Sequence, residues 1–417
     1  MAVTPGTTPG TPRVLRAMND RAALDLLLEH GPLSRTRIGT LTGLSKPTAS
    51  QLLARLEAAG LVIVTGTSEG RPGPNARLYA VNPATAHVAA LDVTPDRILA
   101  EVADITGRTV ATYELPTPGR RGDGAVRHVL DALDGAVKAA GLTRADLHRV
   151  VIGTPGAFDP GTGRLRYASH LPGWHSPTLL DDLAAALPMP LAYDNDVNLA
   201  AVAEHRLGAA RGHDDFVLLW NEEGIGAALV IGGRLHRGRT GGAGEVGFLP
   251  VPGTPLVRQV ARANSGGFQE LAGARAVRVI AGELGLPVPE GPHRQVAAQL
   301  LARAAQYADA VEPTGPVGDG APPDQAHLDL MQRFATGIAT GLASMVAVLD
   351  PGLVVLSGGV IAAGGEPLRA LVQAELAELA VPRPRLVLGT VREHPVLSGA
   401  LQSALATTRD EVFDTSR

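Results

Sequence analysis

Residues 220–229, WNEEGIGAAL, combine a glycine turn that could bind phosphate with acidic residues that would repel it. The apolar run at 216–220 predicts a strand, and the Gly-Ile-Gly turn follows it. A strand that feeds such a turn can bring backbone N–H groups up to a phosphate. Glu222 and Glu223 stand at the mouth of the turn, where their carboxylates oppose a polyphosphate. From this stretch alone, a phosphate loop, a former phosphate loop and an ordinary hairpin all remain open.

Polar or glycine-rich turns follow other predicted strands as well. The strand at 150–153 runs into Thr154-Pro155-Gly156, the strand at 190–193 ends at Asp194-Asn195-Asp196, and the strand at 353–356 ends at Ser357-Gly358-Gly359. Helices are predicted between these strands, at 124–140 and 328–349. This alternation indicates an α/β body whose binding site lies at the strand ends.

Composition limits the classes of function. A chain of 417 residues, 45% apolar and 19% charged, suggests two or three folded domains. It has no cysteine, which excludes disulfides, Cys-ligated zinc and thiol catalysis. It also has no apolar run of about 18 residues and no apolar N-terminal leader, so we expect a cytoplasmic protein without a membrane partner. Residues 1–80 carry nine Lys and Arg against five Asp and Glu, a net charge of +4. Because the whole chain has a net charge of −4, the remaining residues carry −8. A basic head on an acidic body suggests that the head meets a polyanion.

The basic head has the pattern of a winged helix-turn-helix. Helices are predicted at 17–30, at 35–41 after the capping residue Ser34, and from the capping residue Ser45 to about residue 57. Strands at 61–64 and 78–81 then form a hairpin, the wing. In this plan the third helix enters the major groove of DNA. A small helical domain used for protein contacts is the alternative.

The predicted DNA-binding residues are polar or basic and lie at the start of the second or third helix or on the wing. Short polar side chains suit base edges, and a Gly-flanked arginine suits a narrow minor groove. The set is Arg35, Ser45, Lys46, Thr48, Ser50, Gln51, Arg71 and Arg77.

Nearly the whole chain resembles the ROK family of repressors, open reading frames and sugar kinases. The resemblance rests on IGTPGAFDPGTGRL (152–165), SHLPGW (169–174), YDNDVNLAAVAE (193–204), GIGAALVIGGRLHRG (224–238), GGAGEVGF (241–248) and VVLSGGV (354–360). It implies a winged helix-turn-helix at 1–83 and a two-lobed actin/hexokinase-like body. The expected small lobe spans 84–198 with a C-terminal helix at about 396–410, and the expected large lobe spans 199–395.

Compared with the kinases of that family, both turns that bind the phosphates of the nucleotide are altered. Where the family has Asp-x-Gly-Gly-Thr, this chain has Asp92-Val93-Thr94-Pro95-Asp96, in which Pro95 lacks an N–H and Asp96 adds charge. Where the family has Gly-Thr before Gly-Ile-Gly, this chain has Glu222-Glu223. The resemblance therefore implies a former phosphate loop and a degenerate kinase-like domain that is not an enzyme and holds no cofactor.

The sugar cage that the resemblance implies is partly retained. Asn195-Asp196 matches the family's Asn-Asp, whose Asp takes a proton from the sugar hydroxyl. The implied ligand-binding set is Gly156, His170, Asn195, Asp196, Glu245 and Glu270. His170 replaces a sugar-contacting Asn. Phe248 replaces a zinc-binding His, and residues 258–267 lack the zinc-binding cysteines, so no metal is expected.

The sequence therefore predicts a transcriptional regulator that senses a sugar or sugar phosphate, by resemblance a repressor of carbohydrate-related genes. Its partners would be a double-stranded operator with an inverted repeat and a further copy of the chain, as a homodimer or a dimer of dimers. Two alternatives stay open: an active sugar kinase with a fused DNA-binding head, and a regulator controlled by a protein partner without a small ligand.

Overall fold

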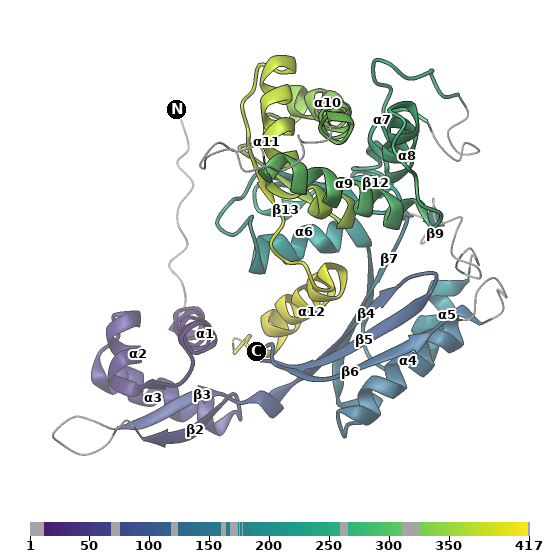
Figure 1. Ribbon diagram of the computed structural model, residues 1–417. Coiled ribbons are helices and arrows are strands. Elements are labelled where there is room, and N and C mark those ends of the chain that lie inside the picture. Colours follow the sequence, from purple (N-terminus) through teal and green to yellow (C-terminus); the bar gives the residue numbers. More distant parts are fainter. Residues whose placement is uncertain are drawn as a thin grey trace, which may run out of the picture.

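The computed structural model describes residues 12–67, 76–117, 124–159, 164–166, 174, 176, 178–258, 266–310 and 325–415, with the backbone alone at 157–159, 164–166, 309 and 310. A head and two lobes follow one another along the chain (Figure 1). In the described part, no helix combines the length and apolar character needed to cross a bilayer.

The head has the helix, helix, turn, helix and hairpin order that the sequence predicts. Its elements are α1 (Pro12–His30), β1 (Leu33–Ser34), α2 (Arg35–Thr42), α3 (Lys46–Ala58), β2 (Val62–Thr67) and β3 (Arg77–Val81). Ser34 and Ser45 cap α2 and α3 by accepting the backbone N–H groups of Arg37 and Thr48. Gly43, with a φ of 71°, ends α2 in the left-handed conformation that glycine favours. The first helix begins at Pro12, earlier than residue 17.

The small lobe contains a mixed sheet with the strand order β10-β7-β4-β5-β6. Strands β4, β7 and β10 are parallel, while β5 and β6 are antiparallel extensions. Helices α4 and α5 pack on one face of this sheet. The elements are η1 (Pro83–Thr85), β4 (His87–Val93), β5 (Arg97–Asp104), β6 (Thr109–Pro116), α4 (Ala125–Ala139), η2 (Arg144–Asp146), β7 (Leu147–Thr154), β8 (Ala157–Asp159), β9 (Arg164–Arg166), α5 (Leu179–Ala186) and β10 (Leu191–Asn195).

The large lobe repeats this strand order as β13-β12-β11-β14-β15, with β11, β14 and β15 parallel. A large apolar core joins one face of this sheet to the helices of the lobe. The elements are β11 (Phe216–Asn221), β12 (Ile225–Ile231), β13 (Arg234–Leu235), η3 (Val246–Phe248), α7 (Phe268–Ala272), α8 (Ala274–Glu283), α9 (His293–Ala310), α10 (Gln325–Leu349), β14 (Leu353–Ser357), α11 (Gly359–Leu379) and β15 (Arg385–Leu388).

Two helices cross between the lobes, α6 (Asp196–Leu207) and α12 (Pro395–Val412). Helix α6 follows the small-lobe sheet but packs on β12 of the large lobe, whereas α12 follows the large-lobe sheet but packs on β4 and β7. The two helices also pack closely against each other (Figure 1). A Cβ at Gly399 would lie 1.8 Å from the carbonyl oxygen of Leu199, so this close approach requires glycine. Any change in the angle between the lobes must therefore involve α6 and α12.

Candidate functional site

The side chain of Asn195 holds the start of α6 in place. Its Oδ1 accepts the backbone N–H groups of Val197 (2.8 Å) and Asn198 (3.2 Å), which caps the helix. Its Nδ2 donates to the carbonyl oxygen of Gly156 at 2.9 Å. The structure thus brings the predicted residues Gly156 and Asn195 together. Because the capping and loop contacts use most of the amide, one N–H of Asn195 is left to meet a ligand.

Asp196 follows Asn195 and is half-buried. One of its carboxylate oxygens accepts the backbone N–H of Val197 at 2.9 Å. Burial raises the pKa of Asp196 to about 7, and the negative charges of Asp92 and Glu245 add to the rise. Near neutral pH, Asp196 therefore exchanges readily between a carboxylate that accepts hydrogen bonds and a carboxyl that donates one.

Glu245 approaches the same region from the large lobe. The preceding Gly244 has a φ of 94°, and its carbonyl accepts the N–H of Ala227 on β12 at 2.9 Å. A Cβ there would lie 1.9 Å from the oxygen of Ala227, so glycine is required for Glu245 to sit beside this strand. Glu245 remains exposed, and partial loss of hydration raises the pKa of its carboxyl.

Asp92 is a third carboxyl at the same place, although the sequence indicated it only as part of a former phosphate grip. It is buried at the end of β4, with Arg97 at 4.0 Å from its Oδ2. Burial raises the pKa of Asp92, and the positive charges of Arg97 and His394 partly oppose this. The charges of Asp92 and Glu245 both act on Asp196, and we call the region of these three residues the acidic cleft.

The remaining members of the predicted cage are less well placed. Glu270 lies at the start of α7 and is exposed, and its side chain forms no hydrogen bond or ion pair with another described residue. His170 lies outside the described residues. Phe248, the residue in place of a zinc-binding His, lies in the short helix η3. Within the described ranges, no group of three or more His, Asp or Glu side chains could hold a metal ion.

An ion pair that the sequence did not predict joins the lobes beside Asn195 and Asp196. Asp194, at the end of β10, is buried and accepts Asn198 Nδ2 at 3.0 Å. Its other oxygen accepts two hydrogen bonds from Arg237, at 3.2 and 2.5 Å. Arg237 follows β13 of the large lobe, so this pair links the strand end of one lobe to the other lobe.

At the strand ends of the large lobe, the Gly-Ile-Gly turn makes its hydrogen bonds within the protein. The N–H of Glu222 donates to the carbonyl of Gly224 (3.0 Å), and the N–H of Ile225 donates to Gln269 Oε1 (2.7 Å). The carboxylate of Glu222 accepts the N–H of Gly359 at the start of α11 (2.5 Å) and lies 3.5 Å from Arg294 Nη1. Backbone and guanidinium groups of the kind that bind phosphate are therefore bound to Glu222 and Gln269 instead.

The structure describes seven of the eight predicted DNA-binding residues, and four of the seven hydrogen-bond in pairs with one another. Lys46, Gln51 and Arg77 are exposed. The hydroxyls of Ser45 and Thr48 bond to each other at 2.8 Å.

Ser50 and Arg35 are engaged with each other. Ser50 donates to the carbonyl of Lys46 (2.9 Å) and accepts Arg35 Nη1 (3.1 Å), so it has less freedom to read a base than its type suggested. Arg71, on the wing, lies outside the described residues.

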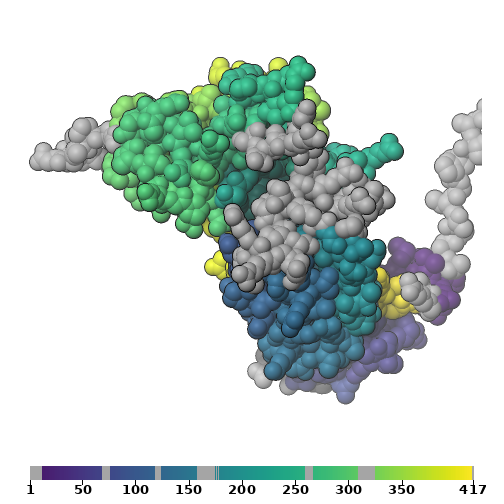
Figure 2. Space-filling view, turned by 90° about the vertical axis from the view of Figure 1, so that its right-hand side faces the viewer, coloured from purple at the N-terminus to yellow at the C-terminus, as the bar shows by residue number. Residues whose placement is uncertain are grey.

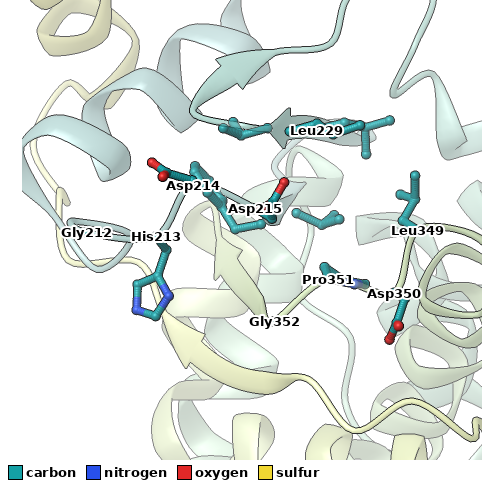
Figure 3. Close-up of a pocket in the computed structure, with 13 residues that line it drawn as sticks. Gly212, His213, Asp214, Asp215, Leu229, Leu349, Asp350, Pro351 and Gly352 are labelled. Atoms are coloured by element: carbon teal, nitrogen blue, oxygen red, sulfur yellow. The ribbon is translucent and has the colours of Figure 1, made fainter. Parts of the chain in front are cut away.

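A cavity of about 460 Å³ lies at the other end of the large-lobe strands, where β11 and β14 begin (Figure 3). Asp214, Asp215 and Asp350 contribute acidic groups to its lining. Asp215 accepts the N–H of Gly232 at 2.8 Å. Gly156, Asn195, Asp196, Glu245 and Glu270, the predicted ligand-binding residues that the structure describes, do not line this cavity.

Two lobes with one strand order, joined by two helices that each pack on the other lobe and preceded by a winged head, define a kinase-like body fused to a winged helix-turn-helix. The ROK family profile matches residues 88–406, and the chain belongs to the ROK family. Residues 15–71 match the profile of the MarR family.

Curated relatives include repressors and kinases. The xylose repressor of Caldicellulosiruptor bescii is 27% identical over 58% of this chain and 61% of the repressor. The DNA-binding transcriptional dual regulator NagC of Escherichia coli is 23% identical over 64% of this chain and 65% of NagC. A glucokinase of Thermotoga maritima is 30% identical over 52% of this chain and 65% of the enzyme. The chain thus spans about three fifths of the length of the xylose repressors it matches.

Solved structures share the fold. A ROK hexokinase from Thermus thermophilus has a TM-score of 0.60 and 28% identity, covering 78% of this chain and 99% of the hexokinase. A ROK family transcriptional regulator, a homologue of the Escherichia coli MLC protein, has a TM-score of 0.69 at 19% identity. The latter covers 94% of this chain and 96% of the regulator, so the likeness of fold includes the head.

Proposed function

We propose that this chain is a transcriptional regulator, a repressor of carbohydrate-related genes, that binds DNA with its head and a sugar in the acidic cleft. The observation that carries the proposal is the contrast at the cleft. Carboxyl groups are present at Asp92, Asp196 and Glu245, while the N–H groups of Gly359 and Ile225 at the former phosphate turn are bonded to Glu222 and Gln269. The similarity to a xylose repressor and to NagC supports the same function.

The charge of the cleft favours an uncharged sugar over a sugar phosphate. Carboxylates accept hydrogen bonds from sugar hydroxyls, and hydrogen bonds to charged groups are stronger than neutral ones. A phosphate would add negative charge beside three acidic groups. The nearby cations already have acidic partners: Arg237 is bonded to Asp194, and Arg97 lies 4.0 Å from Asp92.

The proposal includes the loss of ATP binding. A nucleotide would have to displace Glu222 from Gly359 and Gln269 from Ile225 before its phosphates could reach those N–H groups. Pro95, at the other former grip, offers no N–H. The chain then acts as a sensor and not as an enzyme.

DNA binding would use α3 and the wing. Lys46, Arg71 and Arg77 provide positive charge, and Gln51 is exposed on α3, where it could pair with adenine. Two copies of the chain would place their α3 helices in successive major grooves, about 34 Å apart, on an inverted repeat.

The experiment has two stages. Duplexes are first selected by the protein from a random pool and footprinted. Their affinity is then measured with and without D-xylose, D-glucose and N-acetyl-D-glucosamine, and with the phosphates of these sugars. We expect an inverted repeat, and a change in affinity with at least one uncharged sugar by about 5- to 150-fold, the usual range of allosteric coupling.

Other outcomes would redirect the proposal. DNA selection without any response to sugars or their phosphates would favour a regulator controlled by a protein partner. A response to a sugar phosphate alone would contradict the charge argument.

A further inference from the structure

The apolar core of the head includes residues of the body, two of them large and fully buried. Phe413, just after α12, and Ile105, in the turn between β5 and β6, are 1% and 0% exposed. Both belong to the same apolar cluster as Leu24 and Leu27 of α1 and Leu53 of α3. The head is therefore not packed as an independent unit, because the end of the chain forms part of its core.

Polar contacts link the same chain end to α3. Asp20 of α1 is buried and accepts Arg55 Nη2 of α3 at 2.6 Å. Its second oxygen accepts the hydroxyl of Thr415 at 3.1 Å. A single buried carboxylate thus contacts both α3 and the chain end.

Further contacts fix the chain end on α1. Arg21 pairs with Asp410 at 2.8 Å, and its guanidinium lies 5.8 Å from the ring centroid of Phe413. In the space-filling view, the C-terminal residues (yellow) lie between the head (purple) and the small lobe (blue) (Figure 2).

The other end of α12 lies against the elements of the cleft. Val396, Leu397 and Ala400 pack on β4 and β7 together with Leu199 of α6. Helix α6 begins at Asp196, and β4 ends beside Asp92. One helix therefore runs from the elements that carry Asp92 and Asp196 to the core of the head.

We propose that the chain end at 410–415 is a positioning element for α3: Phe413 and Thr415 hold α1 and Asp20, and Asp20 holds Arg55 of α3. This deepens the proposed function, on which it rests, since it assigns the connection between the cleft and the DNA-binding surface to α12. The orientation of α3 then depends on where the body places the end of α12.

The test uses the full chain with four substitutions. Phe413→Ala removes the apolar contact, and Phe413→Leu restores much of it. Thr415→Val removes the hydrogen bond to Asp20 with little change of shape. Phe334→Ala is the matched control, since Phe334 is also fully buried but lies in the core of the large lobe. Hydrogen exchange of α1 and α3 amides is measured without DNA, and affinity is measured for a duplex that the wild type selects from a random pool.

We expect Phe413→Ala to increase exchange in α1 and α3 and to weaken duplex binding, each by at least about ten-fold, because truncating a buried Phe is costly. Phe413→Leu should recover most of both effects. Thr415→Val should weaken binding by about two- to five-fold, the effect of one modest hydrogen bond. Phe334→Ala should leave head exchange unchanged.

The proposal is wrong if Phe413→Ala leaves head exchange and duplex affinity unchanged, or if Phe334→Ala affects the head equally. Should Phe413→Ala fail to fold, Thr415→Val decides: wild-type exchange and wild-type affinity in this variant would overturn the proposal. If the wild type selects no duplex, the proposed function fails, while the exchange measurements still test the contact between the chain end and the head.

Discussion

The two lobes repeat one strand order, yet their strand ends differ in how their polar groups are used. At the small lobe, Asp92 and Asp196 keep carboxyl groups whose pKa values are raised by burial. At the large lobe, Glu222 and the N–H groups of Ile225 and Gly359 are bound to neighbouring protein groups. The same architecture therefore holds one strand-end site with available acceptors and one whose donors are already used.

This difference separates two roles that a bilobal kinase-like fold can combine. Accepting hydrogen bonds from a sugar needs the acidic groups of the small lobe and Glu245. Holding a nucleotide needs free N–H groups at the large lobe. A protein that keeps the acidic acceptors while the N–H groups of the large lobe are occupied is suited to be a sensor.

The largest expected effect is a complete absence of sugar phosphorylation. With ATP, Mg²⁺ and D-glucose, D-xylose or N-acetyl-D-glucosamine, the chain should release no ADP above the rate without protein. The reason is that Glu222 and Gln269 occupy the donors that a nucleotide would need. A coupled ADP assay measures it. Turnover that disappears in Asp196→Asn would contradict this contrast between the lobes. It would show that the large lobe still binds a nucleotide while the small lobe binds the sugar.

Features that depend on residues close together in the sequence were predictable, and contacts between residues far apart in the sequence were not. Local patterns sufficed for the head, where Leu52, Leu53 and Leu56 share one buried face of α3 and Ser45 caps it. The sequence also showed the acidic residues Glu222 and Glu223 next to the Gly-Ile-Gly turn.

Contacts between distant segments were not predictable. Glu222 meets Gly359, 137 residues further on, and Arg237 meets Asp194, 43 residues earlier. The packing of Phe413 into the head likewise depends on the path of α12 past the small lobe. One sequence carries no signal for such pairs, since charge and apolar character do not specify a partner.

The second prediction concerns the acceptors of the small lobe. Asp196→Ala should weaken sugar binding by about 10- to 100-fold, the effect of losing a hydrogen bond to a charged group. Its affinity for DNA without sugar should stay near that of the wild type. Calorimetry with whichever of the three uncharged sugars binds the wild type measures the first, and a mobility-shift titration measures the second.

The matched control is Asp181→Asn, an exposed acid on α5, which packs on the face of the small-lobe sheet opposite α12. It should bind sugar as the wild type does. Equal sugar affinity in Asp196→Ala and the control would remove Asp196 from the binding site.

The third prediction is a dependence on pH. Because burial raises the pKa of Asp196 from 3.8 to about 7, the folded protein binds this proton more tightly than the unfolded chain. The stabilisation is fully present below the unfolded pKa and is lost as pH rises through about 7. Relative to Asp196→Asn, the wild type should therefore lose free energy of unfolding between pH 5 and pH 8. Urea denaturation of both proteins across this range measures it, and a pH-independent difference would contradict the raised pKa.

Sugar binding should depend on pH in the opposite direction. The carboxylate accepts a hydrogen bond from a hydroxyl only when it is ionised, so affinity should fall by about ten-fold from pH 8 to pH 6, as expected for a group with a pKa near 7. Calorimetry at both pH values checks this. Unchanged affinity would mean that Asp196 serves the sugar as a protonated donor or not at all.

The smallest expected effect concerns the ion pair between Arg237 of the large lobe and Asp194 of the small lobe. Arg237→Gln removes the cation but leaves Asp194 with the N–H groups of Asn195 and Asn198. Because the Arg237 side chain is 51% exposed, the loss in free energy of unfolding should be about 1 kcal/mol. The sugar affinity should change as well, by about two- to five-fold, if the pair favours one angle between the lobes. Urea denaturation and calorimetry measure the two effects.

Arg239→Gln is the control, since Arg239 is exposed two residues further on and its removal changes the net charge equally. It should match the wild type in both measurements. If the two substitutions gave the same small change, the effect would come from overall charge and not from the link to Asp194. If Arg237→Gln changed stability alone, the ion pair would stabilise the fold without favouring one angle between the lobes. Any coupling between the two lobes would then have to run through α6 and α12.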